Sequence, residues 1–250
     1  MVQTLLPIAM DALFTATVLA QTSEPQRIIY AAMHQDYSDR MVSLHDVPDE
    51  ETCGNILVKR LLAGGRGHYG PLEHPQITFT CGYFPHSVIQ QARTHRVGIT
   101  FDCQSMRYTS QSIIRAAEGN VDDLEKAFYV RPVGDYCDRN GSKYFFSEMQ
   151  RHEALAACKY AAIAYRKNIL EHGMSEEHGR SLLPFDYRQH FVVSFNARSF
   201  LHFMDLRSKK DAQLEIQQLC DLLWVGFVQW CPAIATWYSQ HRLGKSRLAP

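Results

Sequence analysis

The sequence predicts an α+β protein that folds as a single domain. The run 13–20 is rich in strand-forming residues, and 76–84 and 189–194 alternate apolar with polar side chains as strands do. Apolar residues recur at helical spacing over 145–171 and 211–230. The 250 residues contain no internal repeat, low-complexity tract or interdomain linker. One domain that combines strands with long helices is therefore the simplest account.

Composition and charge exclude several classes of protein. The net charge is zero and the isoelectric point is about 7.2, which argues against a protein that mainly binds nucleic-acid backbone. Seven cysteines without a CxxC pair indicate neither a disulfide framework nor a thiolate zinc site, and they suit a reducing compartment. The apolar run 5–20 carries Asp11 and lacks a preceding basic region, so we do not expect a signal peptide. No stretch is apolar enough to span a bilayer, and a cytoplasmic enzyme or binding protein is expected.

The first helix is expected shortly after the strand at 13–20. Ser23 is predicted to cap it, with Pro25 in its first turn, and the helix should end near Met33 or His34. Downstream, the sequence indicates a loop or short helix over 36–52, a helix over 56–62 that ends at Gly64-Gly65, and a turn over 67–71.

The middle of the chain is expected to contain one strand, one helix and two loops. The strand at 76–84 should lead into a helix over 85–93, with Pro85 at its start. Residues 97–110 are interpreted as an extended loop. A second loop is expected over 133–143, because this segment is rich in Gly, Asp and Asn.

Longer helices are predicted in the second half. The helix over 145–171 rests on the spacing of Met149, Ala156, Tyr160, Ile163 and Leu170. Gly173 is a suitable stop signal, and Ser175 is expected to cap a short helix that reaches Arg180. A break follows at Leu182-Leu183-Pro184. Asn196 should cap a helix that ends at Leu206, and the helix over 211–230 should end at Cys231-Pro232.

A cationic segment follows the strand at 76–84 and its helix. It contains Arg93-Thr94-His95-Arg96 and, shortly after, Ser105-Met106-Arg107-Tyr108. Guanidinium groups suit bidentate contact with phosphate oxygens, and the hydroxyl of Ser105 can add a hydrogen bond. The segment therefore indicates either a site for a phosphate-bearing ligand or a solvated basic turn.

A second polar cluster begins at Asn196. Arg198 and His202 are four residues apart and share one face of the expected helix, which is either a ligand-facing stripe or a solvated one. His68, Glu73 and His74 lack the HExxH spacing, and we expect no metal site.

Other chemistry is not indicated. Cys103 is interpreted as a half-buried thiol rather than a nucleophile, and Ser105 lacks a Gly-x-Ser-x-Gly context. The sequence contains no Walker A motif, and we expect neither a P-loop nor a Rossmann nucleotide site.

In combination, four blocks in this order resemble the flavin-dependent thymidylate synthases, over roughly residues 13–235. The first block, Gly67 to His74, is similar to that family's Gly-His-x-x-Pro-Phe-Glu-His turn. The other three are His95-Arg96 with Ser105-Met106-Arg107-Tyr108, then Glu177 to Pro184, then Asn196-Ala197-Arg198-Ser199 through Leu206-Arg207 to Gln217. Each block is weak alone, whereas the ordered set is specific.

The chain departs from the family signature at one place. The family pattern is Arg-His-Arg, seven residues, then Ser, whereas this chain has Arg93-Thr94-His95-Arg96 and eight residues before Ser105. Thr94 therefore stands where the first arginine is expected. The departure indicates a divergent branch with a loop that is one residue longer.

The resemblance implies a fold, an activity and a set of site residues. The fold is a mostly antiparallel sheet flanked by long helices, and the activity is the reductive methylation of dUMP to dTMP. The implied cofactor is FAD, with methylenetetrahydrofolate as carbon donor and NADPH as reductant, in a homotetramer whose active sites lie between subunits. Neither nucleic acid nor a membrane is an implied partner.

The resemblance also assigns site residues by residue matching. The flavin is expected at His68, Thr94, His95, Arg96, Asn196, Arg198 and His202 (where the family commonly has Asn). The substrate dUMP is expected at Gln91, Ser105, Arg107, Arg180 and Arg207. Arg207 is the expected catalytic residue and faces the pyrimidine ring.

Two other functions stay open at this stage. One is a regulatory protein that keeps the nucleotide site without catalysis, which the altered motif at Thr94 allows. The other is an RNA- or DNA-binding module that uses the basic loop, which the zero net charge disfavours.

Overall fold

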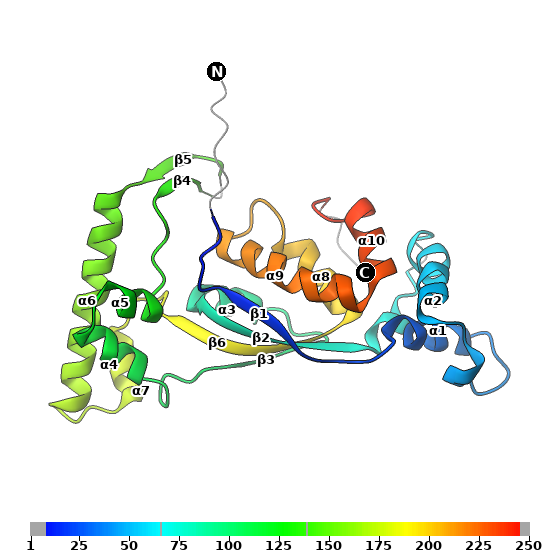
Figure 1. Cartoon of the computed structure of the whole chain (residues 1–250), viewed down its shortest axis with the longest axis horizontal. Coiled ribbons are helices and arrows are strands. Elements are labelled where there is room, and N and C mark those ends of the chain that lie inside the picture. The colour runs from blue at the N-terminus through cyan, green and yellow to red at the C-terminus, as the bar shows by residue number, and fades with distance from the viewer. Residues whose placement is uncertain (1–8, 66, 139, 246–250) are drawn as a thin grey trace, which may run out of the picture. The chain divides into compact units, whose positions relative to one another are not determined.

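The computed structural model describes residues 9–65, 67–138 and 140–245, which form two compact units. Unit 1 comprises 9–15, Gly82–Gln91 and Cys103–Phe191, and unit 2 comprises Ala16–Cys81, Ala92–Asp102 and 192–245. The expected α+β class is confirmed (Figure 1). The assignment of one catalytic domain stays a prediction. Within the described ranges, none of the helices combines the length and apolar character that crossing a bilayer requires.

Four strands form the main sheet, in the order β1 (Thr15–Gln21), β2 (Gln76–Pro85), β6 (Arg188–Asn196) and β3 (Ile99–Cys103). The hydroxyl groups of Thr78 and Ser194 lie 2.9 Å apart, and Gly82 lies against the ring of His190. Residue numbers thus rise along β2 as they fall along β6, so these strands run antiparallel. The expected antiparallel sheet is confirmed.

Helices α8 (Ala197–Arg207) and α9 (Leu214–Trp230) cover one face of the sheet within unit 2 (Figure 1). The rings of Phe200 and Phe227 stack at 4.3 Å, and Phe79 of β2 lies 6.3 Å from Phe200. All three side chains are fully buried. This aromatic layer fixes α8 against the sheet and so determines where its polar residues lie.

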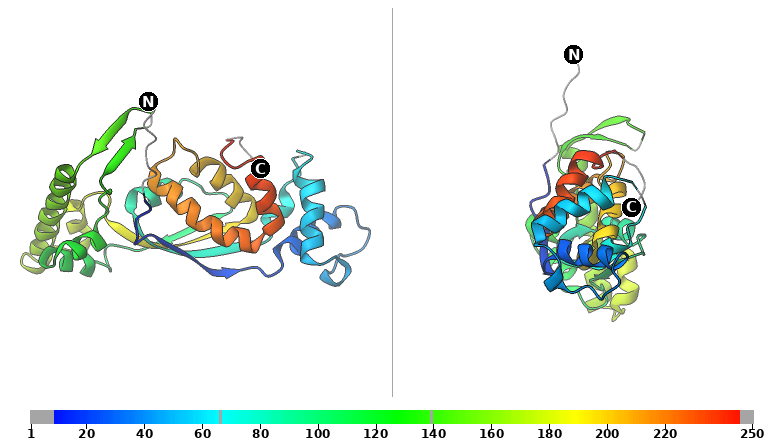
Figure 2. Two further views of the ribbon diagram at one scale, coloured as in Figure 1. Left: turned by 45° about the horizontal axis from the view of Figure 1, so that its top comes forward. Right: turned by 90° about the vertical axis from the view of Figure 1, so that its right-hand side faces the viewer.

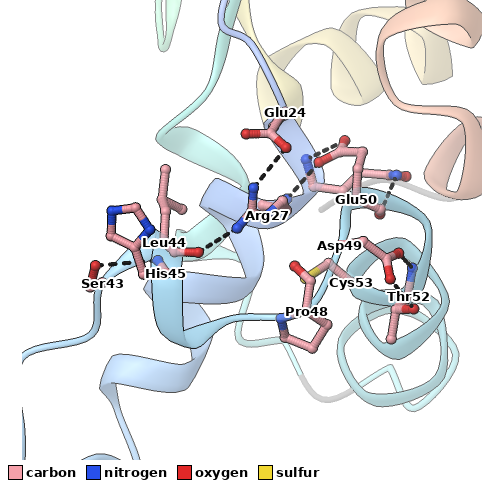
Figure 3. Close-up of polar contacts among 11 residues, drawn as sticks. Glu24, Arg27, Ser43, Leu44, His45, Pro48, Asp49, Glu50, Thr52 and Cys53 are labelled. Atoms are coloured by element: carbon pink, nitrogen blue, oxygen red, sulfur yellow. Dashed lines mark hydrogen bonds and ion pairs between the residues drawn. The ribbon is translucent and has the colours of Figure 1, made fainter.

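Helix α1 (Pro25–Gln35) begins differently from the prediction. Glu24, rather than Ser23, is the N-cap, and its side chain makes no capping hydrogen bond. The backbone N–H groups of Gln26 and Arg27 instead donate to the two carboxylate oxygens of Glu50, each at 2.9 Å (Figure 3). Glu50 is the first residue of α2 (Glu50–Leu57), so the cap comes from another helix and has no local sequence signal.

A π-helix, Val58–Leu62, continues α2, and two 3₁₀ turns, Leu44–Asp46 and Gly70–Glu73, complete this part of unit 2. The predicted helix over 56–62 is therefore present, although the helical segment already begins at Glu50. Helix α9 ends at Trp230, before Cys231-Pro232 as predicted, and Cys231 alone separates it from the next helix. Pro232 starts α10 (Pro232–His241), because proline is compatible with the first helical position.

Unit 1 holds most of the remaining helices: α3 (His86–Ala92), α4 (Gln111–Glu118), α5 (Val121–Ala127), α6 (Glu148–Leu170) and α7 (Glu176–Gly179). Figure 2 shows α4 and α5 beside α6. The core residues of α6 are Leu155, Cys158, Ala162 and Tyr165. The apolar residues that predicted this helix, including Met149 and Tyr160, are exposed instead, so the sequence pattern marked a second face of α6.

Three other sequence interpretations were wrong in detail. Residues 99–103 form β3 rather than an extended loop, because Gly98 and Gln104 pair through backbone hydrogen bonds with β6. The expected loop over 133–143 instead contains strand β4 (Gly134–Cys137), the turn that follows it and the first residue of β5 (Lys143–Phe146), with which β4 forms a hairpin. Asp138, Asn140 and Gly141 belong to the turn, whereas Gly134 and Asp135 belong to β4. Pro85 ends β2 and does not open α3.

Candidate active site

Asn196 sets the start of α8, as predicted. Its side-chain Oδ1 accepts a hydrogen bond from the Ser199 N–H at 2.8 Å, and its own N–H donates to the Gly98 carbonyl at 3.1 Å. Asn196 and Ser199 are both buried. The polar residues of the second cluster are thereby placed along one well-defined helix that runs from Asn196 to Arg207.

Gly98 brings the cationic loop against the beginning of α8. Its φ angle is +65°, a conformation that glycine tolerates and other residues avoid. A Cβ atom at this position would lie 2.2 Å from Ser199 Oγ and 2.3 Å from Asn196 Nδ2. The close approach therefore requires glycine, and it orders the segment that carries Thr94, His95 and Arg96.

Arg207, the last residue of α8, points to this loop. Its Nε donates to His95 Nε2 at 2.9 Å, and its Nη2 donates to Thr94 Oγ1 at 3.0 Å. The ring of His95 packs on Phe203 at 5.0 Å and near His202 at 5.9 Å. Two acceptors from one loop thus hold the guanidinium in a fixed orientation.

His95 is electrically neutral in this arrangement. Its side chain is only 9% exposed, and burial, followed by the charges of Arg207 and His202, lowers its pKa to about 4. Since Nε2 accepts a hydrogen bond from Arg207, the ring proton resides on Nδ1. Burial also lowers the pKa of Arg207, although a guanidinium remains charged at neutral pH.

A cavity of about 380 Å³ opens beside this loop. It is lined by Arg93, His95, Arg96, Ile99, Thr100 and Phe101. The side chains of Arg93 and Arg96 are exposed, so two positive charges and a hydroxyl group face the cavity. Such a donor set suits an anionic ligand.

The remaining residues expected near the flavin lie in two places. Arg198, on α8 with His202, forms an ion pair with Glu73 from the 3₁₀ turn Gly70–Glu73. His68, from the same sequence block, instead contacts Asp36, with 2.7 Å between Nε2 and Oδ2. It lines a separate cavity with residues of α1. The contacts therefore link Thr94, His95, His202 and Arg207 directly and leave His68 apart.

The residues expected at dUMP, other than Arg207, all belong to unit 1. Gln91 lies near the end of α3, and Ser105 follows β3, where its carbonyl accepts hydrogen bonds from Tyr108 and Thr109. The guanidinium of Arg107 lies 5.4 Å from the centre of the Tyr108 ring. Arg180 is exposed just after α7. Neither Arg107 nor Arg180 forms an ion pair with a described residue.

The structure adds contacts that no sequence signal indicates. Thr94, expected near the flavin, uses its hydroxyl group to hold Arg207, and Glu73 holds Arg198. Both pairs join residues more than a hundred positions apart in sequence. Cys103 is a half-buried free thiol, as expected. Among the described residues, no three His, Cys, Asp or Glu side chains gather as metal ligands would.

Comparisons with known proteins identify the family of this chain. Residues 17–233 match the family model described as thymidylate synthase complementing protein. The chain is 32% identical over 244 residues to a flavin-dependent thymidylate synthase of Haloarcula marismortui, covering 93% of this chain and 98% of that protein. It is 31% identical to the enzyme of the same name from Halobacterium salinarum, which covers 93% of this chain and 98% of that protein.

Solved structures show the same fold at lower identity. A UMP/dUMP methylase, PolB, from Streptomyces cacaoi superposes with a TM-score of 0.71 at 19% identity, over 95% of this chain and 97% of that one. Thymidylate synthase X from Helicobacter pylori, solved with FAD and dUMP, superposes with a TM-score of 0.64 at 21% identity, over 87% of this chain and 96% of that one. With the family match and the halophilic relatives, these findings place the chain in the flavin-dependent thymidylate synthase family.

Proposed function

We propose that this chain reductively methylates dUMP to dTMP, with methylenetetrahydrofolate as carbon donor and NADPH as reductant through FAD. Membership of the family supports the reaction. The observation that carries the proposal is the guanidinium of Arg207, held by His95 at 2.9 Å and by Thr94 at 3.0 Å. A charge fixed in this way suits a reaction in which negative charge develops on a bound ring.

Arg207 is proposed as the catalytic residue that faces the pyrimidine. The ring carbon to be methylated must become nucleophilic, which builds negative charge on the ring. A pre-oriented guanidinium stabilises that charge without reorganising. Because neutral His95 only accepts a hydrogen bond, it orients Arg207 without adding a competing positive charge.

The residues of unit 2 fit the expected cofactor. Bound FAD would supply the hydride chemistry. Arg93 and Arg96, which line the cavity of about 380 Å³, offer the donors that a diphosphate requires. The cavity is smaller than the whole cofactor, so we propose that it takes one part of it. Thr94, His95, Asn196, Arg198, His202 and His68 complete the proposed flavin set.

Four residues of unit 1 are proposed to bind dUMP: Gln91, Ser105, Arg107 and Arg180. Arg107 and Arg180 are exposed guanidiniums, and neither forms an ion pair with a described residue. A phosphate monoester carries up to two negative charges, which two arginines can match. Ser105, half-buried at the end of β3, can donate a further hydrogen bond.

We further propose a cytoplasmic homotetramer with active sites between subunits, in which each chain is one catalytic domain. The supports are the family resemblance and the exposed apolar face of α6. Neither nucleic acid nor membrane is proposed as a partner.

The test is an anaerobic visible spectrum of the purified protein with FAD, followed as NADPH is added in the presence of dUMP. We expect bound flavin to bleach, and dTMP to form once methylenetetrahydrofolate is supplied. Omission of dUMP or of the folate is the control for product formation. Protein that binds dUMP but neither holds reducible flavin nor forms dTMP would be the catalytically silent nucleotide binder instead.

A further inference from the structure

Four residues of unit 1 form one hydrogen-bonded network to which the proposed reaction assigns no role: Gln90, His86, Gln189 and Gln104. His86 is the first residue of α3, the helix that also carries Gln91. Gln189 belongs to β6, and Gln104 directly precedes Ser105. The network therefore connects segments that carry residues proposed for dUMP.

The direction of each hydrogen bond in the network follows from the one before it. A carbonyl can only accept, so Gln189 turns its Nε2 to the Gln104 carbonyl, at 2.9 Å. The Oε1 of Gln189 then faces His86 Nδ1 at 2.6 Å, and this nitrogen must carry the ring proton. The other ring nitrogen is left to accept from Gln90 Nε2, also at 2.6 Å. A single tautomer of His86 thus satisfies both neighbours.

Burial makes the centre of the network rigid. Gln189 is only 2% exposed, and a buried amide that loses its partner costs about 1–3 kcal/mol. Gln104 is also held by His190: its N–H donates to the His190 carbonyl at 3.0 Å, and its Oε1 accepts from the His190 N–H at 2.9 Å. The residue before Ser105 is thereby fixed to β6.

The ring of His86 also contacts the segment that follows Arg180. It stacks on Tyr187 at 4.8 Å, with 16° between the planes, and meets Phe185 edge to face at 5.3 Å. The His86 N–H donates to the Tyr187 carbonyl at 3.0 Å. Burial and Cys103 raise the pKa of the Tyr187 phenol, whereas the charge of Arg180 acts in the opposite direction. Tyr187 thus lies within electrostatic range of Arg180, and His86 holds it against α3.

We propose that His86 is a positioning residue of the dUMP site, an inference that rests on the proposed function. It joins three segments, each with a proposed dUMP residue: α3 with Gln91, the segment that leads into Ser105, and the segment that follows Arg180. Binding groups that are held in place before the ligand arrives lose less entropy on binding. Loss of the network should therefore weaken dUMP binding and leave the flavin residues of unit 2 unaffected.

Calorimetric titration of the full chain, supplied with FAD, measures dUMP binding without requiring turnover. His86→Phe keeps a ring against Tyr187 but removes both ring nitrogens, and we expect the Kd of dUMP to rise about tenfold. The Kd of FAD, and kcat at saturating dUMP, should stay within about twofold of the wild type. A merely disturbed fold would lower flavin binding and kcat instead. His172→Phe makes the same change at an exposed position of unit 1 and should leave every value unchanged.

Two further variants separate the network from the packing of the ring. In His86→Asn, the amide Nδ2 can replace Nδ1 as the donor to Gln189, so the Kd of dUMP should stay within about threefold of the wild type. Gln189→Leu should raise this Kd about tenfold, as His86→Phe does. Because both residues act through one network, the double variant His86→Phe/Gln189→Leu should bind little worse than either single variant.

Three results would overturn the positioning role, with circular dichroism as the check on folding. They are an unchanged Kd of dUMP in His86→Phe, a Kd as high in His86→Asn as in His86→Phe, and a rise of about a hundredfold in the double variant, as independent effects would give. A wild type that binds no dUMP would refute this role and the proposed function together. Protein whose dUMP binding depends on His86 but that forms no dTMP would refute only the proposed reaction.

Discussion

His95 and Thr94 orient Arg207 because each accepts a hydrogen bond from its guanidinium. A histidine at this place is useful only while it is neutral, since a protonated ring would be a donor and would repel the guanidinium. Burial meets this condition by lowering the pKa of His95 to about 4. The fixed guanidinium is thus a consequence of where His95 is packed, against Phe203 and His202.

Replacement of Arg207 tests the proposed catalytic role. Arg207→Ala removes the charge that is to stabilise the developing negative ring, and loss of one such group typically costs 10²- to 10³-fold or more in kcat. We therefore expect dTMP formation to fall by at least about 100-fold. Flavin absorbance and the melting temperature should stay close to those of the wild type. Retention of full dTMP formation would refute the role of Arg207.

Two variants of Thr94 test whether its hydroxyl group positions Arg207 or whether the side chain only fills space. Thr94→Val keeps the shape of the side chain but removes the acceptor for Arg207 Nη2. Hydrogen bonds to charged groups contribute about 1.5–3 kcal/mol, so kcat should fall about tenfold or more. Thr94→Ser keeps a hydroxyl group and should retain most of the rate. Equal rates for the two variants would show that the hydroxyl group does not orient Arg207.

His95 should make stability depend on pH. Its pKa is about 4 in the folded protein and about 6.5 when unfolded, so the unfolded chain binds more protons between these values. The contribution of His95 to the free energy of unfolding is complete above about pH 6.5 and is lost as pH falls towards 4. The free energy of unfolding falls by about 1.4 kcal/mol per pH unit in this range, and by about 3 kcal/mol in total. Urea unfolding at several pH values measures this dependence. His95→Gln should flatten it; an equally steep dependence in that variant would assign it to other groups, such as His190.

At the scale of elements, local signals were reliable where a residue acts on its own helix. Asn196 caps α8 and Pro25 opens α1, as their sequence positions predict. The failures have tertiary causes. Glu50 replaces the expected Ser23 cap from another helix, and β3 exists because β6 lies beside it. The apolar residues that predicted α6 lie on an exposed face, because spacing identifies a helix but not the face that packs in the core.

Gly98 is the position at which one element depends most on a single residue. Gly98→Ala adds a Cβ 2.2 Å from Ser199 Oγ, in a conformation with positive φ. Gly65→Ala is a matched control, since its φ is also positive (+58°) but no atom lies within 4 Å of its Cβ. The control should lose only about 1–2 kcal/mol of unfolding free energy, and Gly98→Ala about 1–3 kcal/mol more. Equal losses in urea unfolding would show that the loop yields to the added methyl group.

At the scale of the whole molecule, the proposed site residues are distributed over the two units. The flavin set and Arg207 belong to unit 2, and the other dUMP residues belong to unit 1. Matching motif by motif could nominate these residues, because each block lies in one short segment. It could not find the contacts of Thr94 with Arg207 or of Glu73 with Arg198, which the fold creates between distant segments.

The exposed face of α6 bears on assembly. Met149, Ala156, Ile163 and Leu170 are seven residues apart in sequence, and Tyr160, which shares their face, is 78% exposed. An apolar seam with this repeat is typical of a helix that packs against another helix. Because such a seam can pair with its own copy about a two-fold axis, a second copy of this chain is the occupant that the proposed tetramer supplies.

The double variant Tyr160→Glu/Ile163→Glu should therefore disrupt assembly. Charges in an apolar interface are costly to desolvate, so we expect sedimentation to shift from four copies of the 28.7 kDa chain to a smaller species. dTMP formation should fall with it, since the active sites are proposed to lie between subunits. Ala157→Glu adds a charge to an exposed position of α6 outside the seam and should leave the assembly intact. An unchanged tetramer in the double variant would exclude the seam as an interface, whereas a monomeric wild type would exclude the tetramer itself.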